Sequence, residues 1–183
     1  MIDPLVSHSI AIAMALLLFG ASYHKYRSVS RFRAALANYR LLPTPLVEPF
    51  AWLLPALELT LGICWLLYVF VPQTALATAG LMLLYAMAIG INVARGRVHI
   101  DCGCGGPAGT EQEQPISLGL VIRNVGLATI AALPALPVVE RNLQAADFAA
   151  VGATVLIAVL LYAAMTQLLH NGAAIRAWRM HRG

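Results

Sequence analysis

Charged residues are scarce in this chain: Asp, Glu, Lys and Arg make up 11% of its 183 residues, whereas soluble domains carry about 25%. Hydrophobic residues account for 60%, and the mean hydropathy is +0.77. One domain of this length cannot bury so much apolar surface, which excludes a soluble protein and indicates a membrane protein. The few basic residues cluster at the ends of apolar segments, so we expect no nucleic-acid partner.

Cysteine is also scarce, with only Cys64, Cys102 and Cys104. An odd count excludes a fully paired disulfide framework. A close pair is typical of a redox or metal site, while Cys64 lies in an apolar segment and is expected to pack as a small hydrophobic residue. The first apolar segment lacks a basic leader and a small-residue cleavage site, so we interpret it as a retained span.

Five apolar segments are long enough to cross a bilayer, which needs roughly 20 residues. The sequence predicts spans at 5–23, 46–71, 74–93, 116–139 and 148–169. Between the first two, residues 28–42 place apolar side chains at helical spacing, which predicts an interfacial amphipathic helix capped by Ser30 and ended by Pro43. The alternative is an extension of the first span into water. We therefore expect one all-α, polytopic membrane domain over residues 1–183: a four-helix transmembrane bundle, one further span and a short interfacial helix.

The second span contains two prolines, Pro49 and Pro55, which should kink it. It also contains Glu58, and a carboxylate inside a membrane is costly. We expect Glu58 to face the bundle interior, neutral or paired, with Arg123 of the fourth span as a candidate partner. Val71-Pro72-Gln73 is predicted to form the tight turn after this span.

Two spans separate the loop after the first span from the loop at 96–115, so both loops must lie on one face of the membrane, together with the C-terminal tail. Basic residues are concentrated on that face, and the opposite loops carry only Arg141. The positive-inside rule then places the shared face in the cytoplasm. The cations of the shared face are Lys25, Arg27, Arg31, Arg33, Arg40, Arg95, Arg97, Arg176, Arg179 and Arg182.

The loop at 96–115 carries Cys102 and Cys104, separated only by Gly103. Thiol–disulfide exchange needs a thiolate, access and a second sulfur to resolve the mixed disulfide. Gly103 lets the backbone bend, and a bridge across one residue should be strained and therefore oxidising. His99, Arg95 and Arg97 precede the pair and favour a thiolate, whereas Asp101 opposes it. The pair is thus interpreted as a redox dithiol.

Two other interpretations of the pair stay open. Cys102, Cys104 and His99 could ligate a metal, but a structural zinc site needs four ligands and usually two to four residues between cysteines, so we expect no metal. The cysteines could also be small, inert residues of a structural loop.

Several segments together resemble the methylamine utilisation protein MauE family of DoxX-like membrane proteins, over nearly the whole chain. They are Tyr39-Arg40-Leu41-Leu42-Pro43, Pro55 with Glu58, Asn92-Val93-Ala94-Arg95-Gly96-Arg97, Asp101-Cys102-Gly103-Cys104, and Arg123-Asn124. Gly105 departs from the family pattern, which has Phe there. The resemblance implies a role in maturing methylamine dehydrogenase, a periplasmic enzyme with a disulfide-rich small subunit, together with the thioredoxin-like protein MauD.

The arrangement of spans and cysteines is also similar to that of vitamin K epoxide reductase, whose bundle binds a quinone beside a Cys-x-x-Cys pair. By this resemblance we expect a membrane quinone as electron acceptor. The candidate residues to hold it are Arg123, Asn124, Asn92 and His24, which lie near the cysteine-bearing face in the sequence, together with Glu58. The resemblance implies a bacterial inner-membrane protein with a periplasmic cysteine loop, against the charge count. Alternatives are a non-enzymatic assembly factor, an electron conduit that reduces disulfides, and a small transporter.

Overall fold

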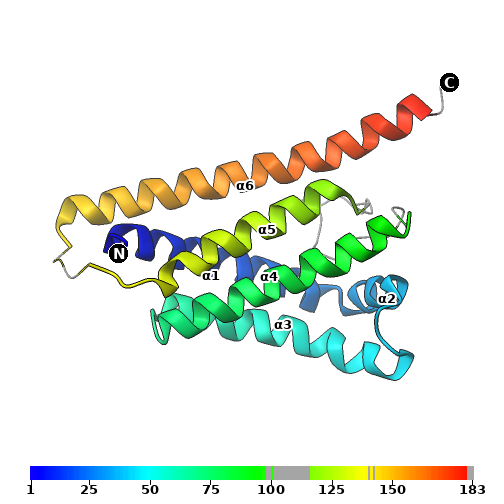
Figure 1. Ribbon diagram of the computed structural model, residues 1–183, viewed down its shortest axis with the longest axis horizontal. Coiled ribbons are helices and arrows are strands. Elements are labelled where there is room, and N and C mark those ends of the chain that lie inside the picture. Colours follow the sequence, from blue (N-terminus) through cyan, green and yellow to red (C-terminus); the bar gives the residue numbers. More distant parts are fainter. Residues whose placement is uncertain (98–99, 101–115, 140, 142, 181–183) are drawn as a thin grey trace.

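The computed structural model describes residues 1–97, 100, 116–139, 141 and 143–180, and within these ranges the chain is all-α (Figure 1). Five helical segments are long and apolar enough to cross a membrane, which confirms the expected polytopic class. The elements are α1 (Pro4–Arg27), α2 (Val29–Tyr39), α3 (Thr44–Leu66), α4 (Val71–Ala94), α5 (Leu118–Ala132), the short 3-10 helix η1 (Leu133–Ala135) and α6 (Ala145–Met180).

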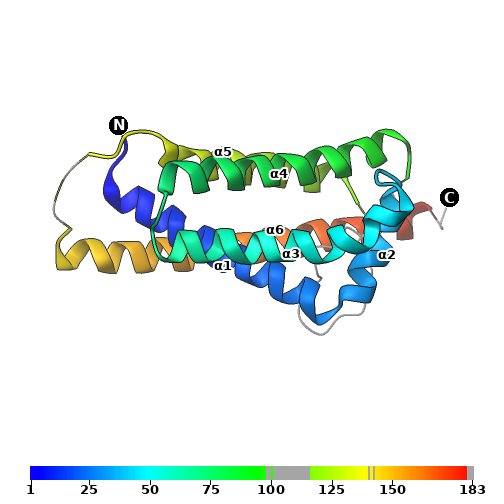
Figure 2. The same cartoon turned by 90° about the horizontal axis from the view of Figure 1, so that it is seen from below.

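Four of the long helices form the bundle. The two most extensive helix contacts join α1 to α3 and α4 to α5, and α3 and η1 both touch α4. The core between them is apolar and includes Leu18, Ala51, Trp65, Ala75 and Met82. α6 lies outside, along α1, as both views show (Figures 1 and 2), and stays largely exposed. This confirms a four-helix bundle with one further span.

The two ends of the bundle differ. One end holds α2, the end of α4, the start of α5 and the C-terminus (Figure 1), as the span count requires; we call it the α2 end. At the opposite end, Arg141 donates hydrogen bonds to Asp3 at 3.0 Å and to Asp147 at 2.8 Å. The Arg141 hydrogen bond holds the pKa of Asp3 below its usual value. Arg141 thereby ties the start of α1 to the start of α6.

α2 is a separate helix and not an extension of α1. The helical path is broken at Ser28, which has φ −136° and ψ 51°. Phe32, Ala35 and Tyr39 form its buried face, which contacts α3. Two predicted boundary residues were wrong: Ser28 rather than Ser30 precedes α2, and the helix ends before the left-handed Arg40, so that Pro43 precedes α3 instead.

The turn between α3 and α4 lies earlier than predicted. α3 ends at Leu66, and Tyr68 and Phe70 take positive φ values of 54° and 49°. Val71 and Pro72 already belong to the first turn of α4. The predicted turn at 71–73 was wrong because proline fits the first turn of a helix, where its missing N–H would have no helical partner.

Gly62 marks a close approach between α1 and α3. A Cβ atom at Gly62 would lie 2.8 Å from Cε1 of Phe19, whereas a Cβ at Gly80 of α4 would meet nothing within 4 Å. Gly62→Leu should therefore lower the free energy of unfolding by about 1–3 kcal/mol through overpacking. Thermal unfolding in detergent measures this, with Gly80→Leu as the matched control. Equal stability of the two variants would contradict the packing described here.

Candidate functional site

A buried ion pair lies near the α2 end of the bundle. The Lys25 Nζ of α1 donates to Oε1 of Glu58 on α3, and the two residues are 4% and 0% exposed. The Tyr85 hydroxyl of α4 donates to the same oxygen at 2.9 Å. The ammonium also lies 5.4 Å from the ring centre of Phe32 and 5.2 Å from that of Tyr85. One carboxylate thus joins three bundle helices, and the pairing offsets the cost of burying both charges.

Glu58 was expected to face the bundle interior, neutral or paired; it is buried and paired, but its partner is Lys25 and not Arg123. The sequence-based prediction counts Lys25 among the cations of the loop face, whereas it lies inside the bundle. The sequence carries little signal for this burial, because α1 is apolar on every side. In the structure, Met14, Leu18 and Ser22 precede Lys25 at helical spacing and all three are buried. A helix face that is buried over three turns carries its next member inward as well.

Proline in α3 is accommodated beside this pair. The Ser22 hydroxyl of α1, one turn before Lys25, donates to the carbonyl oxygen of Pro55 at 2.9 Å. Pro55 lies one turn before Glu58 and is itself buried. The proline segment of α3 is therefore attached to α1 by a second buried hydrogen bond.

An apolar cavity of about 400 Å³ lies between α2, α3 and α4. Lys25, Tyr39 and Tyr85 are the lining residues that carry polar side-chain groups, and Glu58 is bonded to Lys25 without lining the cavity itself. The buried face of α2 forms one wall, so this helix covers a hollow in the bundle. Among the apolar lining residues are Phe32, Ala35, Tyr39, Leu54, Leu84, Met87, Ala88 and Ile89.

Cys102, Cys104 and His99 lie outside the described residues, but both borders of the cysteine segment are described. The Ile116 N–H donates to the Ile100 carbonyl at 3.1 Å, so the two residues that flank segment 101–115 are bonded to each other. Ile100 and Ile116 are 8% and 2% exposed and pack in one cluster with Tyr39, Ile89 and Leu120. Tyr39 and Ile89 also line the cavity, so the cluster and the cavity share a wall.

Arg123 and Asn124, expected to bind a quinone, are buried in α5 at 6% and 3% exposure. The guanidinium of Arg123 lies 5.5 Å from the ring centre of Tyr162 on α6. The Asn124 amide donates to the Leu120 carbonyl of its own helix at 2.8 Å. Arg123 is thus directed at the outer helix.

Asn92 and His24 complete the expected set. Asn92 is fully buried and donates to the Ala88 carbonyl at 3.1 Å, and the ring of His24 lies edge-on to Tyr23. Of the five expected quinone residues, none is among the described residues that line the cavity, although Glu58 is bonded to the lining residues Lys25 and Tyr85, and Asn92 to the backbone of the lining residue Ala88. Beside the cavity, the structure brings Glu58 together with Lys25 and Tyr85, two residues outside the expected set.

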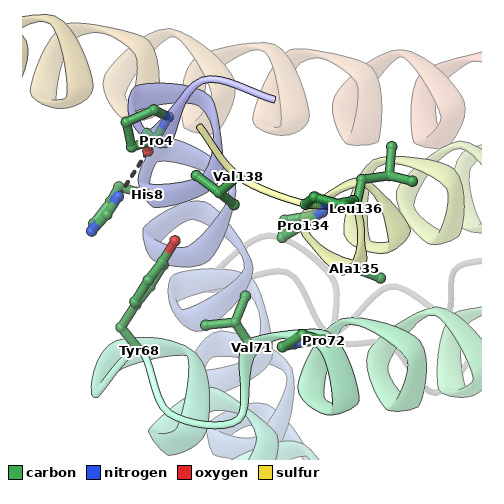
Figure 3. A pocket seen from close by; sticks show the side chains of 10 residues that line it. Pro4, His8, Tyr68, Val71, Pro72, Pro134, Ala135, Leu136 and Val138 are labelled. Carbon is green, nitrogen blue, oxygen red and sulfur yellow. Dashed lines mark hydrogen bonds between the residues drawn. The ribbon is translucent and has the colours of Figure 1, made fainter. Parts of the chain in front are cut away.

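A second hollow, of about 440 Å³, lies at the end of the bundle opposite α2. Figure 3 shows His8 and Tyr68 at its edge, with prolines and Val138 along its wall. The two rings stack at 4.2 Å, and Nδ1 of His8 contacts the Pro4 carbonyl at 2.7 Å. This hollow is remote from the borders of the cysteine segment and is not part of the candidate site.

The third cysteine, Cys64, lies within the described ranges, and the same ranges can be searched for metal-ligand groups. Cys64 is a free, half-buried thiol in α3, as expected for a small packing residue. Within those ranges no group of three His, Cys, Asp or Glu side chains could hold a metal.

Removing Lys25 alone should lower the free energy of unfolding of the bundle more than removing Lys25 and Glu58 together. Lys25→Met leaves the Glu58 carboxylate buried and uncompensated, and we expect it to cost about 3–5 kcal/mol of unfolding free energy. The double variant Lys25→Met/Glu58→Leu should recover most of that loss. Unfolding of both variants in detergent measures the difference, and a Lys25→Met protein as stable as the parent would refute the buried pair.

Comparison with known proteins gives a consistent result. Residues 3–137 match the family described as methylamine utilisation protein MauE. A methylamine utilization protein MauE from Methylorubrum extorquens is 39% identical over 160 residues, which cover 85% of this chain and 84% of that relative. Those from Methylophilus methylotrophus and Paracoccus denitrificans are 46% identical over 102 residues and 36% identical over 131 residues.

The aligned parts differ in extent. The Methylophilus alignment covers 56% of this chain and 54% of the relative, and the Paracoccus alignment covers 72% and 69%. The chain therefore aligns with about half the length of the Methylophilus relative. No solved structure gives a significant match.

Proposed function

Because the chain belongs to the methylamine utilisation protein MauE family, we propose that it is a membrane thiol-disulfide oxidoreductase that supports the maturation of methylamine dehydrogenase. Cys102 and Cys104 carry the chemistry. The observation that favours this is the buried hydrogen bond between Ile100 and Ile116. It fixes both borders of the cysteine segment at the α2 end, and Cys102 follows Ile100 by only two residues, a reach of about 7 Å.

The proposed reaction is a thiol–disulfide exchange. A thiolate of a reduced thioredoxin-like partner, of the MauD type, attacks one sulfur of the Cys102–Cys104 disulfide, and the other sulfur leaves as a thiolate. The second thiol of the partner, as its thiolate, then attacks the partner's own sulfur in the mixed disulfide. The partner leaves oxidised, and Cys102 and Cys104 hold the two electrons and two protons as thiols.

Returning the pair to the disulfide requires a two-electron acceptor. A lipid-soluble quinone takes up two electrons and two protons, which balances the oxidation of two thiols. The cavity between α2, α3 and α4 suits the chemistry of such a molecule, because it is apolar and has Lys25 and Tyr85 in its wall. The chain's contribution would be to hold the acceptor by hydrogen bonds near the cysteine segment.

We place the cysteine segment on the periplasmic side of the bacterial inner membrane, where a disulfide persists. The basic residues of the α2 end favour the opposite orientation by the positive-inside rule. Lys25 does not add to that bias, because it is buried inside the bundle in an ion pair with Glu58 and does not lie in a loop. The arginines remain, so orientation is tested directly by labelling.

Substitution of the cysteines tests the proposal. Cys102→Ala and Cys104→Ala should each abolish the production of active methylamine dehydrogenase in cells, because exchange needs both sulfurs. Cys64→Ala is the matched control and should leave production unchanged. Membrane levels of each variant are measured in parallel by immunoblotting.

Two outcomes would count against the oxidoreductase. Active dehydrogenase produced at parental levels by both loop variants would indicate a non-enzymatic assembly factor. Equal loss of active dehydrogenase in the Cys64→Ala control, at an unchanged membrane level of the variant, would show that the loss is not specific to Cys102 and Cys104.

A further inference from the structure

We infer that the cavity between α2, α3 and α4 binds the ring of a lipid-soluble quinone, with Lys25 Nζ donating a hydrogen bond to a ring oxygen. This assignment rests on the proposed function, since it names the place of the electron acceptor. It differs from the sequence-based expectation, which placed the ring at Arg123 and Asn124.

Apolar residues on the lipid-facing surface border the cavity. Leu84 and Met87 of α4 line it and are 47% and 61% exposed. Leu41, which follows α2, also lines it and is 36% exposed. Because α4 is a candidate membrane span, Leu84 and Met87 face acyl chains. A ligand dissolved in the bilayer can therefore enter between α2 and α4, whereas a water-soluble one would have to cross apolar surface.

The inner wall selects a hydrogen-bond acceptor. An ammonium group has three donors, and the hydrogen bond described for Lys25 Nζ goes to Glu58. The Phe32 and Tyr85 rings also contact the ammonium, at 5.4 and 5.2 Å. Such contacts are weaker than a charge-assisted hydrogen bond in an apolar site. A ligand oxygen in the cavity, within reach of Lys25 Nζ, would accept a hydrogen bond from a further N–H of the ammonium.

Charge balance decides between a neutral and an anionic ligand. Glu58 already neutralises Lys25, and its second carboxylate oxygen is buried without a hydrogen-bond partner among the described residues. An anionic head group, such as that of a fatty acid, would leave a net negative charge in this interior at high cost. A carbonyl oxygen on an apolar ring adds no charge. The cavity therefore favours the chemical class to which quinones belong.

The cavity also lies beside the proposed thiol chemistry. Its lining residues Tyr39 and Ile89 pack in the cluster that contains Ile100 and Ile116. A volume of about 400 Å³ lies within the usual range of small-molecule sites, roughly 300–1,000 Å³. The same hollow therefore has the size, the polarity and the location that an electron acceptor for the loop would need.

Photolabelling tests the site without reference to activity. The full chain, purified into lipid nanodiscs, is irradiated with a short-tailed azido-quinone, and the adducts are mapped by mass spectrometry. We expect adducts on the lining residues of α2 and α4, removed by excess unlabelled short-tailed quinone but not by an alcohol of the same tail length. Adducts on α5 around Arg123, or competition by the ringless alcohol, would overturn the assignment, as would the absence of any competed adduct.

Two variants on α4 locate the ring. Ala88 lines the cavity, and Ala77 lies exposed on the same helix. Ala88→Phe fills the space and should reduce competed labelling by about tenfold or more, the equivalent of losing one good contact, while Ala77→Phe retains it. Equal labelling of the two variants, at equal thermal stability, would overturn the assignment.

Two further variants separate this site from the thiol chemistry. Lys25→Met/Glu58→Leu should lose about tenfold in quinone affinity through the missing hydrogen bond, and unchanged affinity would exclude Lys25 as the donor. Cys102→Ser/Cys104→Ser should bind the probe as the parent does. If the cysteine variant is still photolabelled and also supports normal dehydrogenase maturation in cells, the oxidoreductase is refuted but the binding site is not. If the parent protein is not photolabelled although it carries out thiol exchange, only the binding site is refuted.

Discussion

The ion pair between Lys25 and Glu58 is the constraint on which the arrangement of this membrane bundle depends. Neither charge can stay alone in an apolar interior, so α1 and α3 must meet with these two residues opposed. Tyr85 of α4 donates to the same carboxylate oxygen at 2.9 Å, which adds a third helix to the contact. α2 then packs across the same end, with Phe32 near the ammonium. The cavity between α2, α3 and α4 is thus bounded on its inner side by a neutralised pair.

Two features that are distant in the sequence come together at this end. The borders of the cysteine segment, Ile100 and Ile116, pack with Tyr39 of α2 and Ile89 of α4, and these two residues also form cavity wall. The residues that border the cysteine segment and the cavity thus share two side chains. This is the physical basis for joining an exchange reaction at Cys102 and Cys104 to a lipid-soluble oxidant.

The sequence predicted the class, the five spans and the separate α2 helix, because length, hydropathy and helical spacing are local properties. It also predicted that Glu58 faces the interior, neutral or paired, since the cost of a membrane carboxylate does not depend on the fold. It did not predict the partner, because that choice depends on which helices pack together. Arg123 and Lys25 were both available cations, and only the α1–α3 contact selects Lys25. The turn before α4 was misplaced because proline is compatible with both a turn and the first turn of a helix.

The most direct test of the proposed thiol chemistry is the redox state and the exposure of the cysteine pair in living cells. In a Cys64→Ala background, intact cells are treated with a membrane-impermeant thiol reagent, with and without prior reduction by an impermeant reductant. The account predicts labelling of Cys102 and Cys104 only after reduction, which would mean an oxidised pair facing the periplasm. Labelling that appears only after the membrane is permeabilised would place the pair on the cytoplasmic side, as the arginine distribution favours, and would contradict a periplasmic thiol oxidase.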